Sequence, residues 1–408
     1  MTDVRDRPLW RGRALAFAGI VLVAFSLRSA VAALSPVLAE IRADFDVSAG
    51  VVGLIGAAPP VCFAVFGIVT PALERRFGLE RLTVASMAVA TVAMLARALV
   101  GDALVLLLST AVLFAAVGVG NVVLPPLIKV YFPDRIGTMT GLYSALLAFA
   151  AFVPPLVAVP VADAVGWRFS LGMWAVFALA AIVPWAGLRA RASPASAREV
   201  AEPAPRVLGR LLRLPLAWAL AVTFAATATS VYVCFAWLPV ILVDLAGVSH
   251  GTAGALLALF GALGMPWSVI VPVVITRWRR VGAIYAIALV AGVLGALGMA
   301  LAPMSATVLW VALLGVPQSL FPTVLLLVQQ RARTREGAVA LSGFSQSLGY
   351  AVAGIFPLAF AVMHEATGGW EAALVSLGIL LLLTIPAGIV VTRTRTIEEE
   401  WERRHGAW

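Results

Sequence analysis

Three basic residues lie within or near long apolar stretches of the 408-residue chain, and they are the first candidates for binding chemistry. Arg28 lies near the middle of the apolar run 13–38, and Lys129 is the only lysine in the chain. An arginine in the middle of a hydrocarbon layer costs roughly 2.5 to 3.5 kcal/mol on insertion scales, and its guanidinium cannot lose its proton. We place all 20 acidic residues in loops, tails or helix ends, so none is expected to neutralise Arg28. Arg28 is therefore predicted to bind an anionic or strongly dipolar small molecule, the alternative being that it caps carbonyl groups of a neighbouring broken helix.

Two pairs of polar residues recur at equivalent positions of an internal repeat. Asn121 and Gln318 are 197 positions apart, and Tyr143 and Gln346 are 203 positions apart. Amides supply both donors and acceptors, and burying them without partners is costly. We expect all four side chains to face a central cavity. For Asn121 and Gln318, a hydrogen bond between helices explains the pattern equally well.

The other two cations are placed differently. Lys129 shares a helical face with Asn121 and Pro125, but it lies near the end of its apolar run, where a lysine can extend its ammonium group into water. That second interpretation is the stronger one, although Lys129 stays a candidate for the site. Arg97 lies near the end of the run 82–100, where we expect it to pair with Asp102 or another acid outside the site.

Three aromatic residues complete the candidate set. Tyr232 and Trp237 in the run 215–243 and Phe344 in the run 338–363 are predicted walls or gates, with ordinary aromatic packing as the alternative. The three histidines lie in predicted loops without the spacing of metal ligands, so we expect no metal. Neither a nucleophile and base pair nor a phosphate-binding loop is present, so we predict neither an enzyme nor a cofactor.

The elements that must position these residues are membrane-spanning helices. Hydrophobic residues make up 62% of the chain and charged residues 12%, with a mean hydropathy of +1.02. This composition is typical of an all-α integral membrane protein. Twelve runs are long enough to cross the bilayer. They are 13–38, 49–72, 82–100, 104–130, 137–161, 169–188, 215–243, 252–275, 282–302, 306–329, 338–363 and 371–391.

The basic residues predict the orientation of these spans. Of the 29 Lys and Arg residues, 24 lie in one set of alternate loops and only Arg42 and Arg168 in the other. The positive-inside rule therefore places both termini in the cytoplasm, which explains the net charge of +9 without a nucleic-acid partner. Cys62 and Cys234 lie in apolar runs and are expected to be small buried side chains. The first run is too long for a cleavable signal peptide, so we expect it to remain as a span.

The chain divides into two related halves. The predicted domains are a six-helix bundle at 1–188, a cytoplasmic linker at 189–213, a second bundle at 214–392 and a cytoplasmic tail at 393–408. Pro36-Val37-Leu38 recurs 203 positions later as Pro239-Val240-Ile241, and Gly166-Trp167 recurs at the same offset as Gly369-Trp370. A six-plus-six repeat with a cytoplasmic linker resembles the major facilitator superfamily, in which the substrate binds between the halves near the midplane.

An ordered series of short motifs makes the resemblance more specific. The series is LSPVL at 34–38, GNVVLP at 120–125, GLYS at 141–144, AWLP at 236–239 and GFSQ at 343–346. Together the motifs resemble the cyanate permease and 2-nitroimidazole transporter family over nearly the whole chain. Departures from the wider superfamily pattern are Arg75 in place of an aspartate, small residues at Ala115 and Ala116, and Val153-Pro154-Pro155 in place of a Gly-Pro motif. The departures in spans 4 and 5 weaken the case for a proton-coupled drug exporter.

We therefore expect a secondary transporter of the bacterial cytoplasmic membrane. Its substrate is predicted to be a small cyanate-like anion or a small polar solute, bound around Arg28, and the protein is expected to work as a monomer in the lipid bilayer. Glycines and prolines in spans 1, 4, 5, 7, 10 and 11 are expected to let these helices bend. The alternatives are an efflux pump for nitroheterocyclic or drug-like compounds and, in another class, a non-transporting membrane sensor.

Overall fold

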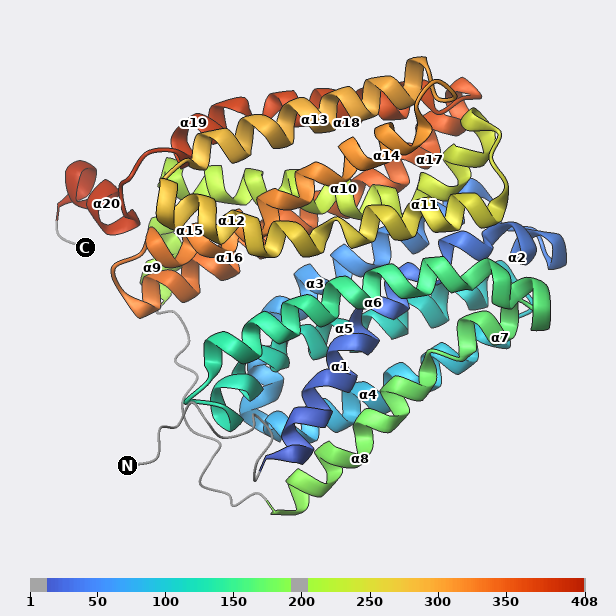
Figure 1. Cartoon of the computed structure of the whole chain (residues 1–408). Coiled ribbons are helices and arrows are strands. Elements are labelled where there is room, and N and C mark those ends of the chain that lie inside the picture. Colours follow the sequence, from blue (N-terminus) through green and yellow to red (C-terminus); the bar gives the residue numbers. More distant parts are fainter. Residues whose placement is uncertain (1–12, 192–204, 407–408) are drawn as a thin grey trace.

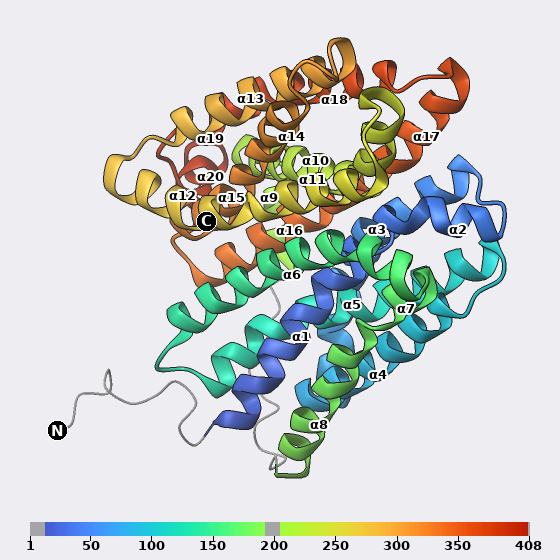
Figure 2. The same ribbon diagram turned by 45° about the vertical axis from the view of Figure 1, so that its right-hand side comes forward.

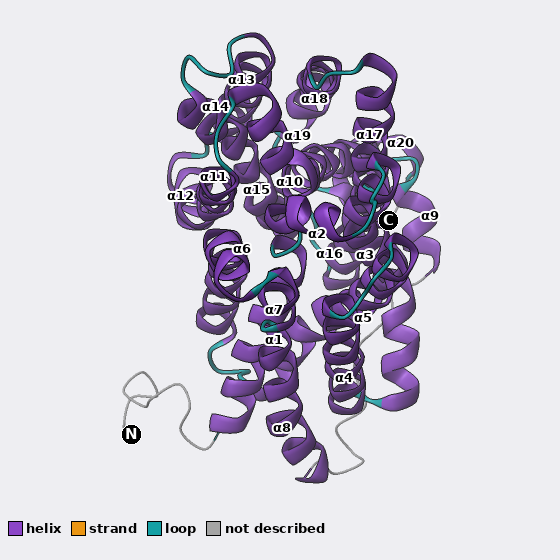
Figure 3. Cartoon of the chain, turned by 90° about the vertical axis from the view of Figure 1, so that its right-hand side faces the viewer, coloured by secondary structure: helices purple, strands orange, loops and turns teal. Residues whose placement is uncertain are grey.

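The computed structural model describes residues 13–191 and 205–406, and every regular element in this part of the chain is a helix (Figure 3). Residues 192–204 of the predicted linker, the first twelve residues and the last two lie outside the described residues. Within the described part of the linker, α8 continues to Arg191 and a short helix, α9, covers Pro205–Leu211. The predicted tail contains another helix, α20 (Ile397–His405).

The helices of the first half begin at Ala14 and end at Arg191. They are α1 (Ala14–Ala32), the 3₁₀ helix η2 (Ser35–Val37), α2 (Leu38–Asp44), α3 (Ala49–Phe77), α4 (Leu79–Ala98), α5 (Ala103–Tyr131), α6 (Ile136–Val165), α7 (Trp167–Gly172) and α8 (Ala175–Arg191).

The helices of the second half begin at Pro215 and end at Val391. They are α10 (Pro215–Ala246), α11 (His250–Ala262), α12 (Gly264–Trp278), α13 (Val281–Leu301), α14 (Thr307–Gly315), the 3₁₀ helix η4 (Val316–Ser319), α15 (Leu320–Gln330), α16 (Arg335–Ala353), α17 (Ile355–Thr367), α18 (Glu371–Leu383) and α19 (Ile385–Val391).

Twelve stretches of the described residues are helical, long and apolar enough to cross a membrane, and each coincides with one predicted run. The predicted ends differ from the observed ends by a few residues. The largest difference is in the first span, which extends to Asp44 because η2 and α2 continue the direction of the chain past the end of α1. The all-helical, twelve-span prediction is confirmed.

Several spans are interrupted near their middle or toward one end. In the first span α1 ends at Ala32, and Pro36, which has no backbone N–H, is the second residue of the short 3₁₀ helix η2. Pro317 plays the same part in the tenth span, where η4 separates α14 from α15. By contrast, α5, α6 and α10 run unbroken although prolines lie inside them. The expected bends in spans 4, 5 and 7 therefore do not take the form of helix breaks.

The two halves lie side by side, with the blue-to-green helices below and the yellow-to-red helices above (Figures 1 and 2). We call the end of the molecule that carries α9 and α20 the α9 side, and the opposite end, which carries α2, α7 and α17, the α2 side (Figure 1). Between the halves, α3 packs on α16 and α17, and α6 packs on α11.

On the α2 side the halves approach closely through glycines. Near the middle of the spans, a Cβ atom at Gly261 of α11 would lie only 2.8 Å from the carbonyl oxygen of Ala151 in α6. A Cβ at Gly254 would lie 2.9 Å from the Pro155 carbonyl oxygen, and one at Gly56 of α3 would lie 2.6 Å from the Cβ of Ala236 in α10. Small residues let the backbones of membrane helices approach in this way. The halves are therefore in close contact on the α2 side.

The internal repeat is visible in one pair of contacts on the α2 side. The indole Nε1 of Trp167 donates a 2.8 Å hydrogen bond to Asp44, and the indole Nε1 of Trp370 donates a 2.8 Å hydrogen bond to Asp244. Trp167 begins the last span of its half and Trp370 immediately precedes the last span of the other. Each aspartate lies near the end of the first span of the same half. The two Gly-Trp motifs thus have equivalent structural roles.

Candidate functional site

Arg28 lies where the two halves meet. It sits one position from the middle of the span Ala14–Asp44 and is partly buried, between the buried residues Leu27 and Ser29. Its Nη1 donates a hydrogen bond of 3.4 Å to the hydroxyl of Tyr232, which belongs to α10 in the other half. No ion pair with a carboxylate is present for Arg28 in the described part of the chain. The predicted unneutralised cation is therefore found at the boundary between the halves.

Tyrosine hydroxyls surround this guanidinium. Tyr232, Tyr350 and Tyr143, from α10, α16 and α6, all lie close enough to Arg28 to interact with it electrostatically. The Tyr350 hydroxyl also lies within hydrogen-bonding reach of the Tyr232 hydroxyl. Tyr143 in turn donates a 3.3 Å hydrogen bond to the amide oxygen of Asn121 on α5. Four helices from both halves thus contribute hydroxyl or amide groups around one cation.

The cluster also has an aromatic wall. The ring of Phe63 on α3 packs edge-on against Tyr350 at 5.5 Å and against Tyr232 at 6.2 Å between centroids. Phe224 contacts the other side of Tyr350 at 4.9 Å. Aromatic faces and edges accept flat ligands, while the guanidinium and hydroxyls supply directional donors. This combination suits a small planar or linear solute with negative charge at one end.

Three members of this cluster, Tyr350, Phe63 and Phe224, were not predicted from the sequence. The chain has five tyrosines, and three of them gather here. Tyr350 follows Gln346 by four positions in α16, so the two side chains share a helical face. A tyrosine on the predicted cavity face of that helix was the available signal. No comparable signal marks Phe63, one of 19 phenylalanines.

Other predicted residues lie outside the cluster. Gln318 donates a 2.7 Å hydrogen bond to the carbonyl oxygen of Phe260, which is the helix–helix bond offered as its alternative role. Gln346 donates to the hydroxyl of Ser342, one turn away on its own helix, at 2.8 Å. These contacts occupy one amide N–H group of each side chain and leave the carbonyl oxygens available.

The predicted gate residues are divided between the two ends of the molecule. Trp237 is fully buried, and its indole donates a 2.8 Å hydrogen bond to the Pro357 carbonyl oxygen at the base of α17. Phe344 instead packs edge-on against the exposed ring of Trp218 at 5.5 Å. Neither ring touches the Arg28 cluster, whereas Tyr232 is its direct hydrogen-bond partner.

Lys129 is exposed in the last turn of α5, and Pro125 on the same face is exposed too. A cation in this position is stabilised by the carbonyl end of its helix. The side chain is accessible from the α9 side, which agrees with either of its two predicted roles.

Arg97 is the residue for which the sequence prediction was wrong. It pairs with no acid in the described structure; Asp102 instead caps α5 by accepting a 2.9 Å hydrogen bond from the backbone N–H of Val105. Arg97 is only 1% exposed, and its Nη1 donates a 3.2 Å hydrogen bond to the carbonyl oxygen of Ala30. Ala30 lies in the last turn of α1, where carbonyl groups lack partners within the helix, so this bond satisfies an orphan acceptor.

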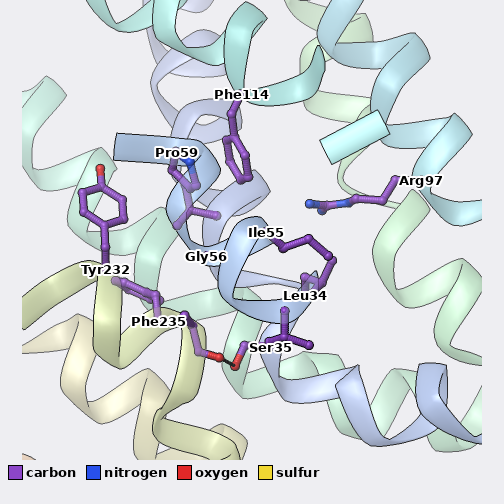
Figure 4. Close-up of a pocket in the computed structure, with 12 residues that line it drawn as sticks. Leu34, Ser35, Ile55, Gly56, Pro59, Arg97, Phe114, Tyr232 and Phe235 are labelled. Atoms are coloured by element: carbon purple, nitrogen blue, oxygen red, sulfur yellow. Dashed lines mark hydrogen bonds between the residues drawn. The ribbon is translucent and has the colours of Figure 1, made fainter. Parts of the chain in front are cut away.

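Arg97 and Tyr232 lie in the wall of one small cavity of about 30 Å³ (Figure 4). The cavity is on the α2 side of the Arg28 cluster and is bounded by α1, α3, α4, α5 and α10. In Figure 4 the Arg97 guanidinium points toward Phe114 and Ile55 from one side, and Tyr232 stands at the other. Tyr232 thus borders this cavity and also accepts the hydrogen bond from Arg28.

No group of three or more His, Cys, Asp or Glu side chains within residues 13–191 and 205–406 is arranged to hold a metal ion. Cys62 and Cys234 both carry free thiols.

Comparison with known proteins identifies the family. Residues 20–354 match the family model described as Major Facilitator Superfamily. The 2-nitroimidazole transporter of Escherichia coli (strain K12) is 30% identical over 389 residues, covering 95% of this chain and 98% of that protein. The cyanate transport protein CynX of the same strain is 27% identical over 357 residues, covering 86% and 90%. A Bacillus subtilis (strain 168) protein named uncharacterized transporter YycB is 30% identical over 395 residues, covering 95% and 96%.

Solved structures show the same fold at lower sequence similarity. A bacterial homologue of the human lysosomal transporter Spinster aligns with a TM-score of 0.73 at 14% identity, covering 95% of this chain and 98% of that one. A D-xylose–proton symporter aligns with a TM-score of 0.67 at 14% identity, covering 94% and 98%.

Proposed function

The chain belongs to the Major Facilitator Superfamily, and from this premise we propose that it carries a small anion, cyanate-like in size and charge, across the cytoplasmic membrane. The substrate binds at Arg28 between the two halves, and the halves rock around it so that the site opens to each side in turn. The membrane location and the transporter family are given by the twelve spans and the relatives; the substrate class and the site are our proposal.

The observation that carries the proposal is the choice of partners around Arg28. A buried guanidinium that is kept permanently for structure is normally neutralised, because an unpaired charge away from water is costly. Here it meets a neutral phenol through one long hydrogen bond of 3.4 Å, with two further phenols nearby. Several of its N–H groups are thus available to an anion, which supplies the missing negative charge and forms charge-assisted hydrogen bonds.

The arrangement of the halves supports a state closed on the α2 side. The glycine contacts of α11 with α6 and of α3 with α10 close that side, and the Ser35 hydroxyl adds a 3.0 Å hydrogen bond to the Ala236 carbonyl oxygen. On the α9 side, Lys129 and Pro125 of the cavity-facing helix α5 are exposed. We propose that the Arg28 site communicates with the α9 side in this state.

The charge distribution supports a cytoplasmic α9 side. The basic residues concentrated in alternate loops put both termini in the cytoplasm under the positive-inside rule. With that orientation, the described state is inward-facing. We further propose that residues 1–188 and 214–392 move as two units joined by 189–213, with 393–408 as a cytoplasmic tail, and that one chain is sufficient for transport.

Export of a small nitroheterocycle is the second candidate. The aromatic wall of Phe63, Tyr232 and Tyr350 favours it, since flat rings stack on such a surface and a nitro group presents partial negative charge to a guanidinium. The relative named 2-nitroimidazole transporter belongs to the same comparison set.

Counterflow in liposomes tests the first proposal. Purified protein is reconstituted, and uptake of labelled cyanate against preloaded cyanate is measured for the native chain, Arg28→Lys, Arg28→Gln and the control Arg277→Gln. Arg277 is exposed on α12, so its removal takes away one positive charge without touching the cluster. We expect Arg277→Gln to match the native rate. We expect kcat/KM of Arg28→Gln to fall at least about tenfold, because a hydrogen bond to a charged group is lost. Arg28→Lys should also be impaired, because an ammonium does not reproduce the planar fork.

Equal cyanate counterflow by Arg28→Gln and the native chain would overturn the assignment of Arg28. Absence of cyanate counterflow in the native chain, together with Arg28-dependent protection of cells against 2-nitroimidazole, would favour the second candidate.

A further inference from the structure

We infer that Arg97 forms a second anion-binding station, distinct from Arg28 and located on its α2 side, which binds small inorganic anions on their path to the central site. The inference rests on the proposed function for the direction of that path. The binding site itself rests on the contacts of Arg97 alone.

The first argument is that the hydrogen-bonding capacity of Arg97 is largely unused. The side chain is 1% exposed, and its one described bond is the 3.2 Å contact from Nη1 to the Ala30 carbonyl oxygen. The Nε atom is buried and has no hydrogen-bond partner. A guanidinium has five N–H donors, and leaving buried donors of a charged group unpaired is costly. A structural tie to α1 requires only one of them.

The second argument is that the free side of the guanidinium faces a cavity. The cavity of about 30 Å³ is large enough for a water molecule, and Figure 4 shows the guanidinium pointing into it. No carboxylate lines the cavity; its polar side chains besides Arg97 are Ser35 and Tyr232. The Ser35 hydroxyl already donates a hydrogen bond to the Ala236 carbonyl oxygen. Since Arg97 is the one charged residue among those that line the cavity, the charge in its wall is positive.

The third argument is the position of the cavity between the central site and the α2 side. Tyr232 lines the cavity and also accepts the hydrogen bond from Arg28, so one phenol lies between the two cations. Gly56 and Ala236, whose contact joins the halves, line the same cavity. When the halves separate on the α2 side, this contact opens and the cavity widens around Arg97. An anion entering from that side then meets Arg97 before it meets Arg28.

Thiocyanate is the probe, because it is a small linear anion that does not react with amines. Its stabilisation of the purified full chain is measured as a shift in thermal midpoint over a concentration series, which reports binding directly. Four proteins are compared: the native chain, Arg28→Gln, Arg97→Gln and the double variant. We expect Arg28→Gln to keep a saturable response, and the double variant to need about tenfold more thiocyanate or to lose the response, since a charge-assisted interaction is removed.

The same Arg28→Gln background allows a variant that leaves the guanidinium in place. Ile55→Phe fills the cavity with a larger side chain, and it should remove the response remaining in Arg28→Gln as Arg97→Gln does. Ile55→Phe tests the proposal if Arg97→Gln fails to fold. Arg97→Lys keeps the positive charge and should retain a weaker response to thiocyanate.

The outcomes separate the two proposals. Identical thiocyanate responses of Arg28→Gln and of the double variant, whether both present or both absent, overturn the Arg97 station. A response that is the same in the native chain and Arg28→Gln, yet lost in the double variant, supports Arg97 and contradicts anion binding at Arg28.

Discussion

Arg28 and Tyr232 are 204 positions apart in the sequence and belong to different halves, yet the guanidinium of one donates a hydrogen bond to the hydroxyl of the other. The bond therefore crosses the boundary between the two halves, along which they move in the proposed transport cycle. Its length of 3.4 Å is near the upper limit for a hydrogen bond, so it orients the guanidinium without satisfying it.

Tyr232→Phe should have a small effect on the central site. It removes a long hydrogen bond and leaves the aromatic ring in contact with Phe63, so we expect the half-saturating concentration of a bound anion to change by less than about threefold. Arg28→Gln in the same assay should weaken binding by about tenfold or more. Thermal-shift titration with cyanate measures both. A loss in Tyr232→Phe as large as in Arg28→Gln would show that the phenol, not the guanidinium, carries recognition.

Gly254→Ala should open the α2 side. The added Cβ would lie 2.9 Å from the carbonyl oxygen of Pro155 in α6, so the halves cannot keep this approach, and the population shifts toward the state open on that side. The measurement is the rate at which a maleimide labels Val52→Cys, a buried position of the cavity wall, in a chain whose Cys62 and Cys234 are replaced by alanine.

Gly141→Ala in the same background is the matched control for that prediction. A Cβ at Gly141 meets no atom within 4 Å, so labelling at position 52 should keep the native rate. If Gly254→Ala labels no faster than Gly141→Ala, the glycine contacts do not hold the α2 side closed.

Glu398→Ala should destabilise the second half. This carboxylate is 1% exposed and accepts hydrogen bonds from the backbone N–H groups of Arg333 and Thr334, at the start of α16. Its removal leaves buried donors unpaired, which costs about 1 to 3 kcal/mol in free energy of unfolding. Glu402→Ala on the same helix removes an exposed carboxylate with a 3.5 Å contact to Arg333, and it should cost less than about 1 kcal/mol. Equal thermal midpoints of the two variants would contradict the anchoring role of Glu398.

Asp134→Asn should make the stability of the chain less sensitive to acid. The Arg13 guanidinium, which hydrogen-bonds both carboxylate oxygens, lowers the pKa of Asp134 to about 2. Because the folded-state pKa lies below the ordinary value of about 3.9, the stabilisation is complete above that value and is lost as the pH falls toward 2. The thermal midpoint of the native chain should therefore fall more steeply than that of Asp134→Asn between about pH 5 and pH 3. Parallel curves would exclude this ion pair as a source of acid sensitivity.

The fold was predictable because it depends on the hydrophobicity and charge of the residues along the chain, which the sequence shows directly. Apolar run length defines twelve spans, and one uncompensated arginine in the middle of the first span marks the boundary between the halves. Which backbone carbonyl oxygen accepts a hydrogen bond from a given side chain was not predictable in the same way. Arg97 binds the Ala30 carbonyl and Gln318 binds the Phe260 carbonyl, and every residue type presents such an acceptor. Which carbonyl is available depends on where a helix ends, and the end of α1 at Ala32 follows from the local break before Pro36.

The described contacts between the halves on the α2 side join glycines to backbone oxygens and to small apolar side chains, with one hydrogen bond from the Ser35 hydroxyl. The two arginines of the loops on that side are occupied within the first half, Arg42 by the Val47 carbonyl and Arg168 by Asp44. Among the described residues, separation of the halves there breaks dispersion contacts and one neutral hydrogen bond but no ion pair. Ionic strength, which screens charge pairs, should therefore have little effect on the rate of separation. Among the physical variables available to an experimenter, hydrostatic pressure and side-chain volume will govern this gate, and salt will not.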